Sequence, residues 1–155
     1  MGDLTASGLS PTVVENYMSI RALPLMVIPL VIYNIVAVFA GGGPATGPLA
    51  AVLFRLPMLS GATWSFTWGD LILLITLGVL FAELVKATYT SSISLVDHGL
   101  SMVVFVGALV EFLVVGAAAT SVFFLILTSS MIDVVAGFTI GIRVARRDLT
   151  IGAGT

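Results

Sequence analysis

Four long apolar stretches dominate this sequence and constrain its fold more than any other feature. They run over about 21–40, 70–87, 98–118 and 121–142. Each is close to the roughly 20 residues that an α-helix needs to cross the hydrocarbon core of a bilayer. Only 9% of the residues are charged, against roughly 25% in an ordinary soluble domain. We therefore predict an all-α integral membrane protein, a single domain built as a bundle of four transmembrane helices.

The segments outside the spans are short, with one exception. A Ser-Pro pair at 10–11 is typical of a helix start, so we expect a short N-terminal helix at the membrane surface. The longest connection, 41–69, is predicted to be extracytoplasmic. Within it the run 48–57 is too short to cross a bilayer and predicts an interfacial or re-entrant helix. Trp64 and Trp68 then suit an aromatic belt at the level of the headgroups.

Prolines and turns refine this picture. Pro29 lies inside the first stretch and is expected to kink it or to free a backbone carbonyl. The third and fourth stretches meet at 116–120 with almost no loop, which predicts a tight antiparallel hairpin. The segments 88–97 and 143–155 are expected to be a cytoplasmic loop and a cytoplasmic tail.

Positive charge indicates the orientation, because Lys and Arg resist translocation across the membrane. Of the 6 Lys and Arg residues, Arg55 alone falls on the predicted outer side. The others fall on the opposite side and are also candidates for contact with anionic lipid or a soluble partner: Arg21, Lys86, Arg143, Arg146 and Arg147. We predict that both ends face the cytoplasm, in a bacterial inner membrane.

Three polar residues lie deep in the predicted spans. Asn34, Glu111 and Asp133 come from three different stretches and are expected at similar depths. An ionised carboxylate near the centre of a bilayer costs about 2.5–3.5 kcal/mol, so each acid needs a proton, a partner or water. Three interpretations stay open: a proton or cation pathway, protonated acids that hydrogen-bond between helices, or a salt bridge to another subunit.

Small residues recur at helical spacing beside these acids. Small and polar side chains that recur every four residues line one face of the fourth stretch: Ser129, Asp133, Gly137 and Gly141. Gly99, Gly107 and Glu111 form a comparable stripe on the third. Such stripes let a second helix approach closely, either within the bundle or from a partner protein.

Other polar residues lie near the expected membrane surface. Glu83 and Lys86 are three residues apart, so they can form an ion pair on one helix face. Asp97 is placed to cap the third helix or to stabilise its first turn. His98 is either ordinary surface polarity or a contact for a quinone head group, a proton, or a metal or tetrapyrrole that a partner also binds.

Composition and motifs exclude several functions. The chain has no cysteine and one histidine, so thiolate metal sites, cysteine nucleophiles and a bis-histidine haem within the chain are excluded. Phosphate-binding loops, nucleophile elbows and zinc-protease motifs are missing from the sequence. The lack of a basic block argues against nucleic acid. We predict neither an enzyme nor a bound cofactor or metal.

These observations favour an accessory or scaffolding subunit of a larger inner-membrane complex. The loops are too small for a catalytic domain, and the small-residue stripes suit docking to a membrane-protein partner or a second copy of the chain. The alternative is a small proton- or cation-coupled transporter or channel that uses Glu111, Asp133 and Asn34. Quinone or lipid chemistry at His98 ranks third.

Overall fold

The chain is mostly helical in the computed structural model, which describes residues 24–41, 45–88 and 93–152. The four long helices are α2 (Val27–Phe39), α4 (Trp68–Ala87), α5 (Ile93–Val114) and α6 (Ser121–Gly152). Between α2 and α4 lie one helical turn, α3 (Thr46–Leu49), and two strands, β1 (Val52–Pro57) and β2 (Thr63–Thr67). A 3-10 turn, η1 (Gly116–Ala118), connects α5 to α6.

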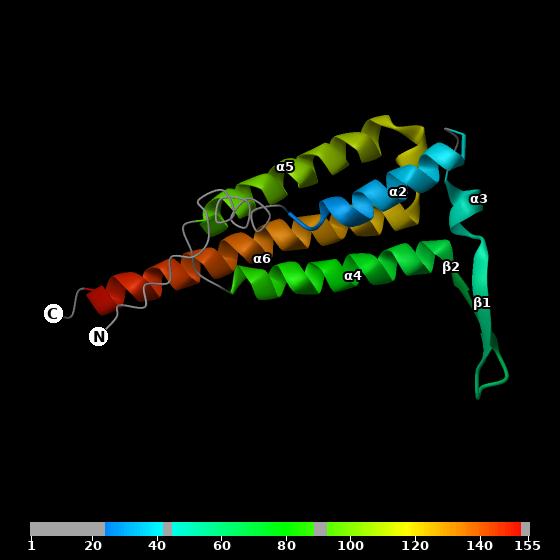
Figure 1. Cartoon of the computed structure of the whole chain (residues 1–155), viewed down its shortest axis with the longest axis horizontal. Helices are drawn as coiled ribbons and strands as arrows, with labels where there is room; N and C mark the ends of the chain where they lie inside the picture. Colours follow the sequence, from blue (N-terminus) through cyan, green and yellow to red (C-terminus); the bar gives the residue numbers. More distant parts are fainter. Residues whose placement is uncertain (1–23, 42–44, 89–92, 153–155) are drawn as a thin grey trace, which may run out of the picture.

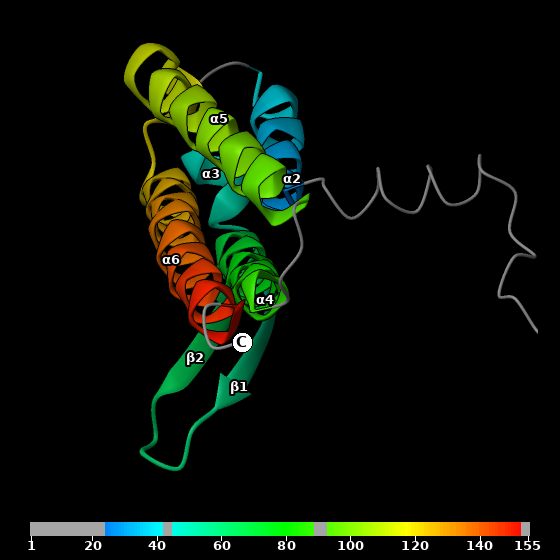
Figure 2. The ribbon, with the colours of Figure 1, turned by 90° about the vertical axis from the view of Figure 1, so that its left-hand side faces the viewer.

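The long helices run back and forth along one direction, and the hairpin projects across that direction at one end (Figure 1). Viewed along the helices, α6 lies beside both α4 and α5 (Figure 2), and α2 contacts α4 and α6. The most extensive helix contacts are those of α6 with α5 and with α4. α6 is therefore the central helix. Its close packing on α5 agrees with the predicted hairpin.

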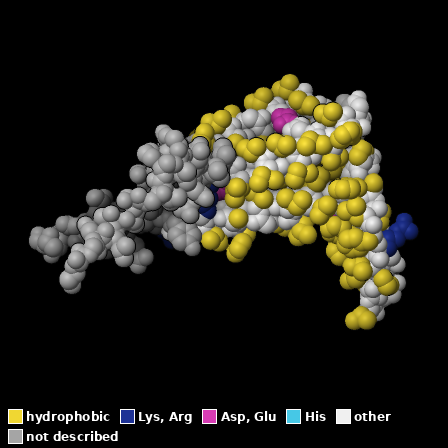
Figure 3. Space-filling model, in the orientation of Figure 1, with side chains coloured by type: hydrophobic (Ala, Val, Ile, Leu, Met, Phe, Trp, Pro, Cys, Tyr) yellow, Lys and Arg dark blue, Asp and Glu magenta, His cyan; other side chains and the backbone are white. Residues whose placement is uncertain are grey.

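Among the described residues, two helices are long and apolar enough to cross a membrane. These are α4 and the first 20 residues of α6, Ser121–Ile140. Helix α2 and the Gly99–Val114 part of α5 are apolar but shorter. Figure 3 shows hydrophobic side chains over most of the visible face of the described helices. These features support membrane association, whereas four transmembrane helices stay a prediction.

The expected interfacial helix at 48–57 is wrong, and with it the prediction of a purely α-helical chain. Helix α3 ends at Leu49, and the segment continues as β1, which pairs antiparallel with β2 and has a bulge between Val52 and Phe54. Gly61, with φ of 84°, provides the left-handed turn residue. The second strand, Thr63–Thr67, alternates hydroxyl and aromatic side chains after this turn, as strands do, whereas the apolar run 48–57 by itself suits helix and strand alike.

The helix ends differ from the predicted spans. Helix α2 begins only at Val27, so Pro29 lies in its first turn, where the missing N–H has no partner within the helix anyway. Helix α5 covers Ile93–Val114 rather than 98–118, and α6 continues ten residues beyond the predicted end at Ile142, to Gly152. The predicted N-terminal surface helix lies outside the described residues.

Helix α4 starts two residues before the predicted boundary, because Thr67 and Asp70 form a capping box. The Thr67 hydroxyl oxygen accepts from the Asp70 backbone N–H at 3.2 Å, and the Asp70 carboxylate accepts from the Thr67 backbone N–H at 2.8 Å. Two backbone donors at the helix start are thereby satisfied. This fixes where the chain leaves the hairpin and enters the bundle.

Candidate functional site

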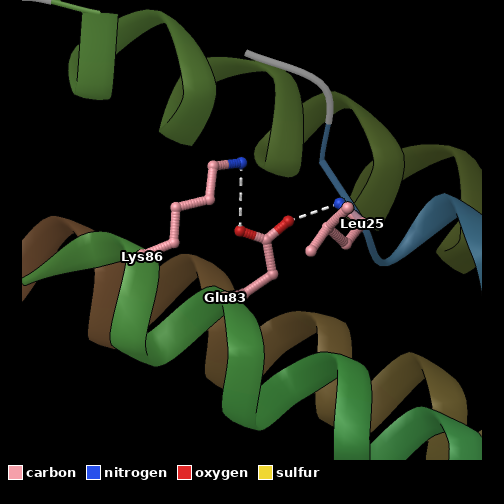
Figure 4. Close-up of polar contacts among 3 residues, drawn as sticks. All are labelled: Leu25, Glu83 and Lys86. Atoms are coloured by element: carbon pink, nitrogen blue, oxygen red, sulfur yellow. Dashed lines mark hydrogen bonds and ion pairs between the residues drawn. The ribbon is translucent and has the colours of Figure 1, made fainter. Parts of the chain in front are cut away.

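A buried carboxylate joins two helices at the end of the bundle away from the hairpin. Glu83 of α4 is 3% exposed and lies 3.3 Å from the Lys86 ammonium, which is 27% exposed. Its second oxygen accepts from the backbone N–H of Leu25, just before α2 (Figure 4). The carboxylate therefore has a cation on one side and a backbone N–H donor on the other. The predicted Glu83–Lys86 pair is confirmed, and it also anchors the start of α2.

A second buried acid, Asp133, lies on the central helix. It is 3% exposed, like Glu83. Val122 of α6 lies beside Gly69 of α4, and both helices run in the same direction. Counting 1.5 Å per residue from that contact puts Asp133 roughly 17 Å and Glu83 roughly 21 Å along their helices. The two acids therefore lie within about one helical turn of each other in depth.

Hydroxyl groups accompany these acids on the inner faces of α4 and α6. Thr76 donates to the Ile72 carbonyl at 2.7 Å, and Ser130 donates to the Leu127 carbonyl at 2.8 Å. Both side chains are only 1% exposed. Such bonds to the same helix satisfy buried hydroxyls without a partner from another helix. This polar face is compatible with close helix packing.

The structure separates Glu111 and Asp133, which the sequence places within about one helical turn in depth. Glu111 is half-buried in the last turn of α5, and Asp133 lies far along α6. The helical rise separates the two acids by roughly 13 Å along the bundle. Asn34 is half-buried on α2 and donates to the Leu30 carbonyl at 3.1 Å, within its own helix.

Tyr33 forms a polar contact that the sequence interpretation missed. Its hydroxyl donates to the Ala117 carbonyl at 2.8 Å and lies 2.6 Å from the Thr120 hydroxyl, 84 and 87 residues away in the chain. Thr120 Oγ1 in turn accepts from the Phe123 backbone N–H at 3.2 Å, at the start of α6. Glu111 is near enough to interact electrostatically with Tyr33.

The two small-residue stripes have opposite environments. On α6, Ser129, Asp133 and Gly137 are buried within the bundle. On α5, Gly99 and Gly107 are exposed, and a Cβ atom added at either would meet no atom of the described residues within 4 Å. The α6 stripe is therefore an internal packing face, whereas the α5 stripe is open.

The remaining candidates lie at the surface or outside the described part. Trp64, Trp68 and Arg143 are exposed. The side chains of several predicted residues lie outside the described residues: Arg21, Asp97, His98, Gly141, Arg146 and Arg147. Within the part of the chain that the structure describes, no three His, Cys, Asp or Glu side chains are grouped so as to hold a metal ion.

Some of the missed residues had a signal in the sequence. Thr67 and Asp70 fit the capping-box pattern before an apolar run, so this helix start was predictable. A tyrosine in an apolar stretch also indicates a hydrogen-bond partner, although its spacing does not identify Thr120. In comparisons with known proteins, no family model, no curated protein and no solved structure matches the chain.

Proposed function

We propose that this chain is a membrane-embedded, non-enzymatic subunit that assembles with another membrane polypeptide through the outward face of α5. The observation that carries the proposal is the exposed stripe of Gly99, Val103 and Gly107, which recur every four residues and are followed at the same spacing by half-buried Glu111. The comparable stripe on α6 is already covered within the bundle. An open small-residue stripe in a bilayer is suited to a second helix.

In this proposal α2, α4, α5 and α6 cross a bacterial inner membrane as four spans. The exposed apolar side chains around the helices suit lipid or a partner helix far better than water. With the hairpin outside, Arg55 would be the single basic residue on that side, as the distribution of positive charge predicts. Both ends of the chain then face the cytoplasm.

Glu111 adds chemical specificity to the α5 face. Its carboxylate is half-buried and follows Gly107 on the same stripe. A carboxylate in the membrane needs a proton or a cationic partner, so a Lys or Arg side chain on the docking helix would complete the contact. A membrane helix that presents small residues and one basic residue is the partner that this face fits.

The test compares a bulky side chain on the open face of α5 with the same change on α4. Gly107→Phe is expected to remove the partner when the complex is extracted gently from its native membrane and weighed by native mass spectrometry. Gly78→Phe is the matched control, because a Cβ added at Gly78 also meets no atom of the described residues within 4 Å. A partner that survives Gly107→Phe, or a wild-type chain that is monomeric in its membrane, would contradict the proposal.

A second candidate function is a proton or cation pathway along α4 and α6. It is favoured by the buried carboxylates of Glu83 and Asp133, which lie within about one helical turn of each other in depth. Intramembrane acids of this kind often form proton relays. In liposomes with a pH gradient, the wild-type chain would then carry protons and Asp133→Asn would not. No flux from the wild type alone would remove this candidate.

A further inference from the structure

The hairpin β1–β2 has two chemically different faces. Residues that pair across the antiparallel strands lie on the same face, and the pairs alternate between the two faces. One face carries two pairs, Phe54 with Phe66 and Leu56 with Trp64. The other face carries the pairs Arg55 with Ser65 and Pro57 with Thr63. One side is therefore aromatic and aliphatic, and the other presents hydroxyls and a guanidinium group.

The apolar face is a preassembled cluster that remains open. Phe54 stacks on Phe66 with ring centroids 4.7 Å apart, and Trp64 meets Phe66 edge-on at 5.5 Å. Yet Phe54, Leu56 and Trp64 are 46%, 44% and 48% exposed. A two-stranded hairpin is marginally stable by itself in water, so a face like this requires an apolar or interfacial environment.

The position of the hairpin indicates which environment it meets. The hairpin extends across the helix direction from the start of α4 (Figures 1 and 2). Hydrophobic side chains gather on the side of the hairpin that is turned back toward the helices (Figure 3). If the helices cross a bilayer, the hairpin lies along the membrane surface with its apolar face toward the hydrocarbon layer.

We propose that the hairpin is an in-plane membrane anchor that binds the phospholipid boundary on the side opposite the end of α6. The inference rests on the proposed membrane embedding of the bundle. Aromatic side chains prefer the headgroup level, where Trp64 and Phe54 enter the glycerol and upper acyl region. The exposed Arg55, on the opposite face, reaches the lipid phosphates, whose negative charge it complements. The anchor limits tilt of α4 through the rigid Thr67 cap.

Two single-tryptophan variants test this placement, because Trp64 and Trp68 are the chain's only tryptophans. Trp68→Phe leaves Trp64 on the hairpin, and Trp64→Phe leaves Trp68 at the start of α4 as a reporter of the bundle itself. Each full-length variant is reconstituted in phosphatidylcholine vesicles whose acyl chains carry bromine at different depths. We expect the fluorescence of Trp64 to be quenched most strongly by bromines attached near the headgroup. We also expect Trp64 to be protected from quenching by iodide in the aqueous phase.

Matched substitutions on the two faces sharpen the test. In the variant that keeps Trp64, Leu56→Asp places a charge on the apolar face and is expected to move Trp64 into reach of iodide. Thr63→Asp places the same charge on the polar face and is expected to leave the quenching pattern unchanged. Equal effects of the two substitutions would overturn the assigned orientation of the hairpin.

The possible failures are distinguishable. Quenching of Trp68 by bromolipid with Trp64 open to iodide would overturn the anchor and leave the embedded bundle standing. No bromolipid quenching of either tryptophan would overturn both. In a third outcome, Trp64 is shielded from both iodide and bromolipid, and bromolipid quenches it only after the protein is diluted in lipid. A second copy of the chain would then cover the hairpin, and the assignment of lipid as the binding partner would be wrong.

Discussion

Helices α5 and α6 carry similar stripes, and the fold uses them in opposite ways. On α6 small residues and an acid recur every four positions, and on α5 two glycines eight positions apart share a stripe with an acid. On α6 the members Ser129, Asp133 and Gly137 are buried, whereas on α5 Gly99 and Gly107 remain exposed. The comparison teaches that such spacing predicts how closely a helix can be approached. It does not predict which helix makes the approach.

The difference follows from the position of each helix in the bundle. Helix α6 is central and packs on α2, α4 and α5, whereas α5 packs mainly on α6 and on the turn that joins them. The side of α5 that faces away from α6 therefore remains apolar and exposed, with Val103 at 68% and Val114 at 77%. This exposed side of α5 is the face at which we propose that a partner binds.

The largest expected loss of stability comes from removing Glu83, the buried acid of α4. It is compared with the loss from removing Glu111 on α5. Glu83→Ala removes the partner of the Leu25 N–H and of Lys86 in a buried position. We expect the free energy of unfolding to fall by about 3 kcal/mol, the upper end of the cost of leaving a buried donor without its acceptor, because that acceptor is charged. Glu111→Ala, at a half-buried position, is expected to cost less than about 1 kcal/mol. Unfolding in detergent, followed by circular dichroism during titration with denaturing detergent, measures both.

Lys86→Met supplies the control for that comparison. It keeps the aliphatic length of the side chain and removes the charge, while the Leu25 hydrogen bond to Glu83 remains possible. Its effect is expected to fall between the two alanine variants, because the buried Glu83 carboxylate loses its cation and keeps the Leu25 N–H as a donor. If Glu111→Ala destabilises the isolated chain as much as Glu83→Ala, the open stripe is not a separate, partner-facing surface.

An intermediate effect is expected from filling the two stripes with the same side chain. Gly137→Leu adds volume within a buried face of α6 and is expected to lower the free energy of unfolding by about 1–3 kcal/mol, the range for overpacking. Gly107→Leu adds it at an open position of α5 and is expected to change stability by less than about 0.5 kcal/mol. The same detergent titration measures both, and equal losses would contradict the assignment of the two faces.

The sequence alone predicts the helices well and the contacts between them poorly. The predicted span at 70–87 differs from α4 by two residues, because apolar length and a capping box mark that helix locally. The run 48–57 was misread because its apolar composition suits helix and strand alike, and the pairing of Phe54 with Phe66 that decides between them lies across the hairpin.

The candidate site shows the same limit. The Glu83–Lys86 pair was predictable because both residues lie on one helix, three positions apart. The Leu25 contact with Glu83 joins positions 58 residues apart, and no local pattern indicates it. Counting from the predicted span ends places Glu111 and Asp133 within about one helical turn in depth, whereas α5 ends at Val114, so Glu111 lies in its last turn.

The smallest expected change in stability comes from adding one methyl group at a closely packed glycine or at an exposed glycine of the same helix, α4. A Cβ atom added at Gly69 would lie 3.1 Å from Val122 Cγ2 and 3.3 Å from the Leu49 carbonyl oxygen, whereas one at Gly78 would meet no atom of the described residues within 4 Å. Gly69→Ala is expected to lower the free energy of unfolding by about 1 kcal/mol through overpacking. Gly78→Ala is expected to raise it by about 0.5 kcal/mol, because alanine restricts the unfolded chain.

A double substitution separates the two contacts at Gly69. Val122→Ala removes the side-chain obstacle and leaves the Leu49 carbonyl, which belongs to the backbone of α3 and cannot turn aside. If the side chain dominates, Gly69→Ala costs less in the Val122→Ala background, and the coupling between the two changes is favourable. If the carbonyl dominates, the cost is the same in both backgrounds. Stabilisation by Gly69→Ala in the wild-type background would instead mean that α3 and α6 do not close on the start of α4.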